Sequence, residues 1–502
     1  MLMIGQSFPE YVFIRTAIIA LRLVAPSSAV YIVLSLYNGW SLFNLFGLYA
    51  LAEVLFYLLV FLPRRARLQA TASDAPRLSA SERRTLFTKC AQSMTADSAS
   101  GWFTPSAASK GDRDAAVGAD DARDWLLWSL FSATPGEVLD EWHEELDAYA
   151  ATLAQFLGYP LRRGRNAERR ALRLSFDPVV ALHRPLLWYT IVALVDAITC
   201  VAMRALGFDH YDVPGAWRRA FPPRPVLALL ALFSPSATTP DIPYWYRPHR
   251  AKDKLPILFL HGIGIGLWPY LPFLRELVAQ DPDIGILALE LLPISARITS
   301  PPPPRPALLT ALTNTLDAHR LPRAVLAAHS YGTALAAYAL RHPPLANRIP
   351  AALLVDPIPF LLHHPAVAYN FVYRAPRTAN EWQLWYFAAR DPDVARALGR
   401  HFHWFEAVLF REDLGLARPV HCDADGAGPG RRVAVALAGR DQLVDAPAVR
   451  RYLTGEDEPR ERWEGGGLEV LFFEGEDHAT VFDDGRKRRM LREVVRRFVR
   501  VA

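Results

Sequence analysis

The sequence predicts an α/β domain in the C-terminal half of the chain, preceded by an apolar helical hairpin and a helical spacer. Three observations support this prediction. From about residue 255 onwards, short apolar runs alternate with helical patterns, as in a sheet covered by helices. Two long apolar segments lie close to the N-terminus. Residues 324–338 read as a strand, a sharp turn at a serine and a small-residue helix.

Length and composition limit the classes of protein that we expect. A chain of 502 residues is long enough for two or three domains, or for one large domain with appendages. Its 3 cysteines, Cys90, Cys200 and Cys422, are widely spaced and odd in number, which argues against a disulfide framework and a cysteine metal site. The net charge is +5, but the arginines are scattered and form no basic stripe, so we expect no nucleic acid partner.

Residues 1–67 are predicted to be a membrane anchor with two transmembrane helices. The apolar segments 12–37 and 41–62 both exceed the roughly 20 residues that cross a bilayer. Because Arg22 and Glu53 would lie at similar depths, one hypothesis is that they form an ion pair inside the membrane.

The orientation of this anchor follows from its charges. The basic run 64–67 directly after the second segment indicates a cytoplasmic end, which places Met1 and the C-terminal α/β domain in the cytoplasm. No small-residue cleavage site follows the first segment, so we expect a multi-pass membrane protein with the lipid bilayer as a partner.

The middle of the chain is predicted to connect the anchor to the C-terminal α/β domain. Residues 68–122 read as a largely flexible linker with one short helix near 81–94, and residues 123–240 as a helical spacer. Segment 186–206 is a third apolar stretch, but Asp196 lies at its centre. We expect a buried or membrane-surface helix there, because a central acid opposes insertion.

The strand–turn–helix at 324–338 presents Ser330 at its turn. A serine on such a turn is exposed above the end of its strand and is typical of a nucleophile. The turn needs small neighbours, and Gly332 fits this need. Ala328 stands where the usual pattern has glycine, which is a mild departure because it adds one methyl group.

A second glycine-rich turn follows the strand at 255–260. Backbone N–H groups aimed at a carbonyl oxygen stabilise the negative charge that develops there during acyl transfer. We predict that the amides of Ile263 and Tyr331 form such an oxyanion hole. The motif residues of the two turns are His261, Gly262, Gly264, Ala328 and Gly332.

Two further strand ends carry the residues that would activate the serine. Asp441 follows the strand at 432–438, and His478 follows the strand at 468–473. A serine hydroxyl needs an imidazole to take its proton, and that imidazole needs a carboxylate to hold it, so we predict a triad of Ser330, His478 and Asp441. Asp356, also at a strand end, is the fallback acid.

Residues 241–502 form the predicted catalytic domain, with a lid at about 358–430. This long excursion lies between two strands and is rich in aromatic residues. These aromatics have three alternative explanations: an apolar acyl pocket, a lid that meets the bilayer, or the ordinary packed core of a lid.

The motifs at 261–264, 328–332, 439–441 and 477–478 together resemble those of the α/β-hydrolase superfamily, over roughly the C-terminal half of the chain. The resemblance implies an eight-stranded, mostly parallel sheet with helices on both faces and a site at the carboxyl ends of the strands. Over its whole length the chain also resembles membrane-anchored fungal members of the superfamily. Serine at 330 differs from the aspartate nucleophile of epoxide hydrolases and haloalkane dehalogenases.

The sequence therefore predicts a membrane-tethered serine hydrolase that cleaves carboxylic esters, lipid-like ones above all, through an acyl-enzyme. No metal ion and no organic cofactor are expected, and the expected partners are an ester substrate and the bilayer. Peptidase, thioesterase and acyltransferase activities are alternatives on the same fold. An inactive binding or scaffold protein is the alternative from a different class.

Overall fold

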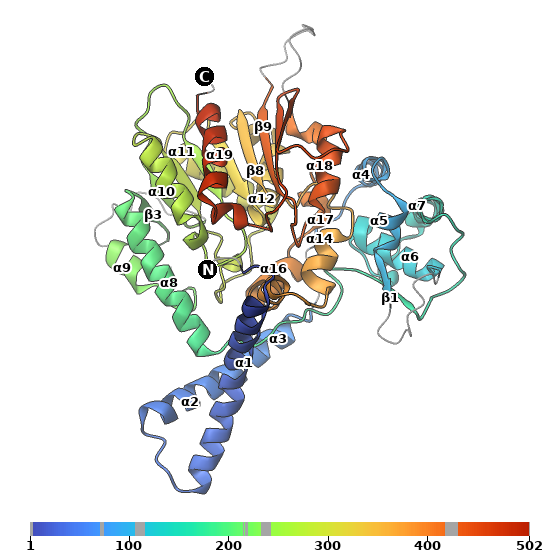
Figure 1. The fold of residues 1–502 in the computed structure, drawn as a ribbon. Helices are drawn as coiled ribbons and strands as arrows, with labels where there is room; N and C mark the ends of the chain where they lie inside the picture. The colour runs from blue at the N-terminus through green and yellow to red at the C-terminus, as the bar shows by residue number, and fades with distance from the viewer. Residues whose placement is uncertain are drawn as a thin grey trace.

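A mostly parallel sheet of nine strands organises the C-terminal half of the chain (Figure 1). The structure, a computed structural model, describes residues 4–70, 75–105, 116–213, 215, 219–231, 242–416 and 430–500. The strands stand in the order β10-β11-β9-β8-β7-β5-β6-β4-β3. They are β3 Asp209–Tyr211, β4 Tyr244–Arg247, β5 Ile257–Leu260, β6 Ile286–Leu289, β7 Val325–His329, β8 Ala351–Val355, β9 Arg432–Ala438, β10 Arg462–Gly465 and β11 Leu468–Phe473.

The predicted number of eight strands is wrong by one for the part of the chain that the structure describes. The strands from β6 through β5, β7, β8 and β9 to β11 pair in parallel. Antiparallel strands close both edges, with β4 and β3 beside β6, and β10 beside β11. The outermost strands β3 and β10 are short and at most partly buried, so they lack the apolar runs that mark the central strands in the sequence, whereas β4 is mostly buried.

Both faces of the sheet are covered by helices, because the central strands are apolar on both sides. Leu326 and Ala328 of β7 point to one core, whereas Val325 and Ala327 point to the other. Figure 1 shows α10 and α19 in front of the sheet, on the face of the second core. The helices that flank the sheet are α10 Leu271–Gln280, α11 Arg305–Ala318, α12 Tyr331–Leu340, α13 Pro343–Ala346, α18 Ala446–Thr454 and α19 Gly485–Phe498.

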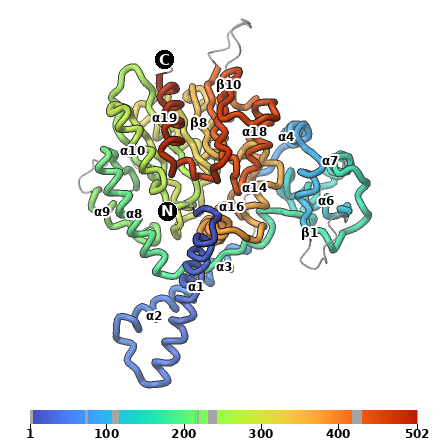
Figure 2. The backbone as a smooth tube through the Cα atoms, viewed as in Figure 1, coloured from blue at the N-terminus to red at the C-terminus, as the bar shows by residue number. Residues whose placement is uncertain are grey.

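The N-terminal apolar segments form a helical hairpin that projects away from the rest of the chain (Figure 2). Its first arm is α1, Phe8–Tyr37; its second arm is α2, Leu45–Phe56, continued by the π-helical turn Tyr57–Phe61 and by α3, Leu62–Arg67. Both arms are long and apolar enough to cross a membrane. The start of α1 lies against the C-terminal half of the chain, where Ile14 and Ile18 are buried beside Ala379 and Tyr386.

Glu53 does not pair with Arg22, so the proposed intramembrane ion pair is wrong. Its carboxylate accepts hydrogen bonds from the His183 ring at 2.7 Å and from the Leu186 amide at 2.8 Å, and Tyr49 donates to it at 3.3 Å. The side chain is fully buried by these contacts. The hairpin is thereby tied to a segment far along the chain, a partner that no local sequence pattern indicates.

Residues 75–176 form a second lobe beside the lid. The stretch that we expected to be a largely flexible linker contains two helices and a strand that pairs with a later one; residues 71–74 and 106–115 lie outside the described part. The elements of the lobe are α4 Ala80–Ala91, α5 Ala96–Ser100, β1 Phe103–Pro105, α6 Ala119–Leu126, a π-helical turn Leu127–Phe131, α7 His143–Leu157 and β2 Arg169–Ala171.

The third apolar stretch is helix α8, Leu186–Ala205, which lies against the C-terminal half of the chain (Figure 1). It too is long and apolar enough to cross a membrane. However, Asp196 at its centre pairs with Arg224 at 3.0 Å and with Arg297 at 2.8 Å. Arg224 in turn pairs with Glu290, which follows β6. This ion network docks one face of α8, as expected for a partly buried helix; the short helix α9 is Pro225–Ala231.

The predicted lid is a series of short helices between β8 and β9, of which residues 417–429 lie outside the described part. Two of its helices continue into π-helical turns, at Tyr369–Tyr373 and Trp385–Ala389. The lid lies between the sheet and the α4–α7 lobe, and it packs against the start of α1. Its helices are α14 Ala366–Ala368, α15 Ala379–Leu384, α16 Pro392–Arg400, α17 Trp404–Ala407 and a 3-10 turn Arg411–Leu414.

Candidate active site

Ser330 lies at the tight turn between β7 and α12, as the elbow pattern predicts. Its φ of 50° and ψ of −121° are strained for a residue with a side chain. A Cβ on Gly332 would collide with the carbonyl oxygen of Leu260 on the neighbouring strand, so only glycine fits there. Ala328 is buried in the sheet without such a conflict. The alanine is therefore compatible with the turn.

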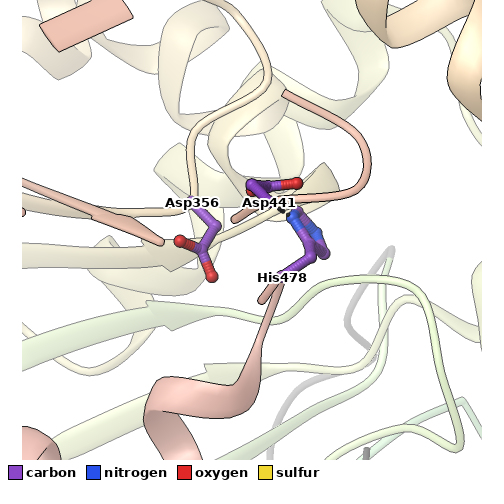
Figure 3. A group of neighbouring side chains, drawn as sticks. All are labelled: Asp356, Asp441 and His478. Atoms are coloured by element: carbon purple, nitrogen blue, oxygen red, sulfur yellow. Dashed lines mark hydrogen bonds and ion pairs between the residues drawn. The ribbon is translucent and has the colours of Figure 1, made fainter. Parts of the chain in front are cut away.

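Ser330, His478 and Asp441 form one continuous chain of hydrogen bonds. The His478 Nδ1 lies 2.7 Å from the Asp441 Oδ2, and its Nε2 lies 2.8 Å from the Ser330 Oγ. A carboxylate only accepts, so Nδ1 donates to Asp441, and Nε2 then accepts from the serine hydroxyl. Figure 3 shows the Asp441 carboxylate beside the His478 ring. This is the arrangement in which an imidazole can take the serine proton.

The Asp441 carboxylate is held in place by its own loop. Its Oδ1 accepts from the amides of Leu443 at 2.7 Å and Val444 at 3.0 Å, which leaves Oδ2 for His478. Asp477, which sequence reasoning did not single out, bridges the two loops: its Oδ1 accepts from the Gln442 and His478 amides. Its position directly before the predicted base was the one signal available.

Asp356, the fallback acid, lies next to the triad but does not bond to the His478 ring (Figure 3). Its oxygens accept from the amides of Ala438 at 2.9 Å and Ala479 at 2.8 Å. These bonds tie the ends of β8 and β9 to the loop that carries His478. Asp356, Asp441 and His478 could together approach one metal ion, but the Asp441 and Asp356 oxygens already serve amide and ring donors.

The glycine-rich turn after β5 faces the serine. A Cβ on Gly262 would lie 2.8 Å from the Ser330 Cβ, which shows how closely the two turns approach. Within the described residues, the amides of Ile263 and Tyr331 donate to no other group, and both residues line a cavity with Ser330. The Gly264 amide instead bonds to the Ile294 carbonyl at 3.1 Å.

His261 and His329 are buried and hold the two turns. The Leu291 amide donates to the His261 Nε2 at 2.9 Å, and the other ring nitrogen lies 2.8 Å from the Gly262 carbonyl oxygen. The His329 Nδ1 lies 2.7 Å from the Tyr270 hydroxyl. Burial lowers the pKa of both imidazoles below the ordinary value, so they remain neutral at physiological pH. Neither contacts the Ser330 hydroxyl.

The pKa of His478 moves in the opposite direction. Burial by itself lowers this pKa, but the negative charge of Asp441 and its hydrogen bond outweigh burial and raise the pKa to about 9. Asp356 and Asp477 add to the rise. The site therefore stabilises a positive charge on the imidazole, which is the charge that the ring acquires when it accepts a proton from serine.

Two apolar cavities meet at Ser330. The first, which we call the lobe-side cavity, runs between the lid and the α4–α7 lobe and is lined by Trp102, Trp128, Phe371 and Phe402 among others. The second, the helix-side cavity, runs towards α8 and is lined by Trp188, Ile265 and Phe387. An acyl pocket is one of the three explanations that the sequence allows for the lid aromatics, and sequence reasoning missed Trp102, Trp128 and Trp188, which lie outside the lid.

Residues 257–500 match the family model described as the alpha/beta hydrolase family. This part of the chain belongs to that family, and it contains Ser330, Asp441 and His478. No curated protein matches the chain.

Solved structures similar to the chain include three esterases or phospholipases. A bacterial membrane phospholipase A, described as a virulence factor, is 15% identical, with 63% of this chain and 94% of that chain covered and a TM-score of 0.38. Carboxylesterase CesB from Bacillus subtilis is 13% identical, with 61% of this chain and 98% of that chain covered and a TM-score of 0.37. Naproxen esterase from the same organism is 11% identical, with 61% of this chain and 98% of that chain covered and a TM-score of 0.35.

Proposed function

We propose that this protein is a serine hydrolase that cleaves carboxylic esters, and that Ser330, His478 and Asp441 are its catalytic residues. The observation that carries this proposal is the unbroken chain of two short hydrogen bonds from Asp441 through His478 to the Ser330 hydroxyl. Such a chain makes the hydroxyl nucleophilic without a cofactor. The family of residues 257–500 supports the reaction class.

The reaction follows from the geometry of these groups. The Ser330 Oγ attacks the ester carbonyl while His478 Nε2 takes its proton, and the amides of Ile263 and Tyr331 stabilise the oxyanion. The carbonyl re-forms, the alcohol leaves with the proton from Nε2, and an acyl-enzyme remains. A water molecule then gives its proton to Nε2, attacks the acyl carbon and releases the acid, and Ser330 recovers its proton.

Lipid-like esters are the proposed substrate class. Both cavities that meet at Ser330 are lined mostly by apolar side chains, which favours apolar groups on both sides of the scissile bond. The helix-side cavity includes Trp188 of α8, a helix that leaves Leu194 and Val201 exposed. The cavity therefore shares a helix with an apolar surface, on which a lipid would be at high local concentration.

The domain arrangement and the membrane topology belong to the same proposal. Residues 1–67 would anchor the chain through α1 and α2, and residues 241–502 would form the catalytic domain, on the cytoplasmic side. The basic residues of α3, directly after the second apolar arm, support this orientation. Protease treatment of sealed vesicles with the cytoplasmic side outward tests this orientation. A C-terminal tag on the protein should be digested fully without detergent, because it lies on the outer face of these vesicles.

Ester turnover tests the proposed function. The full-length chain in detergent should hydrolyse p-nitrophenyl butyrate, and Ser330→Ala should reduce the rate by at least about a thousandfold. Ser300→Ala, an exposed serine of the same domain, is the matched control and should keep the wild-type rate. A folded wild type without turnover, or equal rates in wild type and Ser330→Ala, would contradict the proposal and favour a binding or scaffold role.

A further inference from the structure

The lobe-side cavity is one of two routes away from Ser330, and the position of His478 distinguishes them. His478 lines the helix-side cavity but not the lobe-side cavity. The departing alcohol must lie near the His478 Nε2, because this nitrogen supplies its proton. Under the proposed function, on which this inference rests, the alcohol part of the substrate therefore occupies the helix-side cavity. The acyl chain is left with the lobe-side cavity.

The far end of the lobe-side cavity is closed by three tryptophans. A further apolar cavity lies behind them, lined by Phe87, Cys90 and Phe156 of the α4–α7 lobe. Among the described residues, the aromatic side chains that line both cavities are Trp102, Trp128 and Trp404. These three side chains therefore lie between the far cavity and the lobe-side cavity. We call these three residues the tryptophan wall.

The tryptophan wall is held rigidly by hydrogen bonds from each indole N–H. Trp102 donates to the His363 carbonyl, Trp128 to the Ser175 hydroxyl and Trp404 to the Ser129 carbonyl, each at 2.9 Å. The rings of Trp102 and Trp128 also contact each other, with centroids 5.6 Å apart. A rotation of any ring would break a buried hydrogen bond, so the wall resists displacement by a ligand.

We propose that the tryptophan wall sets the maximum acyl chain length that the enzyme accepts. Two of its three members, Trp102 and Trp128, come from the α4–α7 lobe, outside the residues 257–500 that match the family. The lobe thus acts as a specificity element that closes the acyl cavity from outside the catalytic domain. A chain that fits in front of the wall is bound along its length, whereas a longer one must leave part of itself out of the cavity.

Opening the wall is the direct test. Trp128→Ala would join the lobe-side and far cavities, and each additional methylene that becomes buried is worth about fourfold in affinity. We expect the ratio of kcat/KM for p-nitrophenyl palmitate to that for p-nitrophenyl butyrate to rise at least about tenfold over wild type. Trp128→Phe should shift the ratio in the same direction by less. Phe156→Ala, which lines the far cavity but not the lobe-side cavity, should leave the ratio unchanged.

The outcomes separate this inference from the proposed function. If the wild type does not hydrolyse butyrate, the proposed function fails, whatever the chain-length ratios. If the wild type and Trp128→Ala both hydrolyse butyrate but share one palmitate-to-butyrate ratio, the wall does not limit the acyl chain. An equal rise in Phe156→Ala would also overturn the inference. If Trp128→Ala does not fold, Trp128→Phe decides by the same ratio.

Discussion

At the scale of single residues, Asp441 and Asp356 both lie close to His478, but only Asp441 bonds to its ring. The roles of the two carboxylates should therefore separate on substitution. Asp441→Asn should lower kcat for ester hydrolysis by about ten thousandfold, because the wrong tautomer of the imidazole would be favoured. Asp356→Asn should reduce kcat far less, since Asp356 contacts the Ala438 and Ala479 amides and the His329 ring but makes no hydrogen bond to the His478 ring. Equal losses in the two variants would contradict this division.

The pKa of His478 predicts how the reaction depends on pH. The imidazole must be neutral to accept the serine proton, and its pKa is raised to about 9. Acylation of Ser330 should therefore become faster as the pH rises, with a midpoint near 9. In Asp441→Asn the midpoint should fall, because the raising charge is gone. Stopped-flow rates of acylation between neutral and alkaline pH measure both midpoints, and a wild-type midpoint below neutrality would contradict the account.

The raised pKa of His478 also affects the stability of the fold, which should decrease as the pH rises. Because the folded state raises the pKa of His478 above its ordinary value of 6.5, the charged ring stabilises the fold. This contribution is complete below about pH 6.5 and is lost as the pH rises through about 9. We therefore expect the highest activity at alkaline pH, where the charge on His478 stabilises the fold least.

The three triad side chains could be predicted because each follows an apolar strand, in the order Ser, Asp, His. The supporting residues could not be predicted in this way. Asp477 acts through backbone amides, and its role depends on how two loops approach each other. The tryptophan wall depends on contacts between the lid and a lobe far away in the sequence, and tryptophans at helical spacing are indistinguishable from ordinary core.

At the scale of elements, the central strands were predictable because both of their faces are buried and their residues are continuously apolar. The edge strands β3 and β10 were not, because they are short and carry polar and charged residues. The helices of the N-terminal hairpin were also predictable from their apolar length. Their attachment to the rest of the chain was not, since Glu53 meets His183 only in the folded structure.

The contact of Glu53 with His183 makes a testable link between the hairpin and the start of α8. Glu53→Ala would leave the buried His183 ring and the Leu186 amide without an acceptor, at a cost of about 1–3 kcal/mol for each. We expect faster amide hydrogen exchange at residues 183–190, measured by mass spectrometry on the full chain in detergent.

Arg22→Ala is the matched control for this measurement, because Arg22 takes no part in the contact. Its exchange rates at residues 183–190 should equal those of wild type. If Arg22→Ala accelerated exchange as strongly as Glu53→Ala, the result would support a role of Arg22 in holding Glu53 and contradict this prediction.

At the scale of the whole molecule, three apolar helices are candidate membrane spans, but they differ in what they contact. The arms α1 and α2 project from the rest of the chain, whereas α8 is docked by the Asp196 network. If α8 crossed a bilayer, Asp196, Arg224 and Arg297 would have to separate, and buried ions without partners are strongly unfavourable. We therefore propose a two-helix anchor with α8 at the side of the C-terminal half of the chain.

The docking of α8 can be measured through Asp196. Asp196→Ala would leave the buried guanidinium groups of Arg224 and Arg297 without this partner, and we expect a loss of about 3–5 kcal/mol in the free energy of unfolding of the catalytic domain. Asp253→Ala, an exposed aspartate on the same domain, should change it by less than about 0.5 kcal/mol. Denaturant unfolding followed by tryptophan fluorescence compares them, and equal midpoints would contradict the docking.

The central claim is that the Ser330 hydroxyl is the activated nucleophile of this chain. The most direct test is to incubate the full-length protein with a fluorophosphonate and to locate the adduct by peptide mass spectrometry. We predict one adduct, on Ser330, that forms in wild type and is absent from His478→Ala although that variant is folded. An adduct on another residue, or an unmodified Ser330 in folded wild type, would contradict the account.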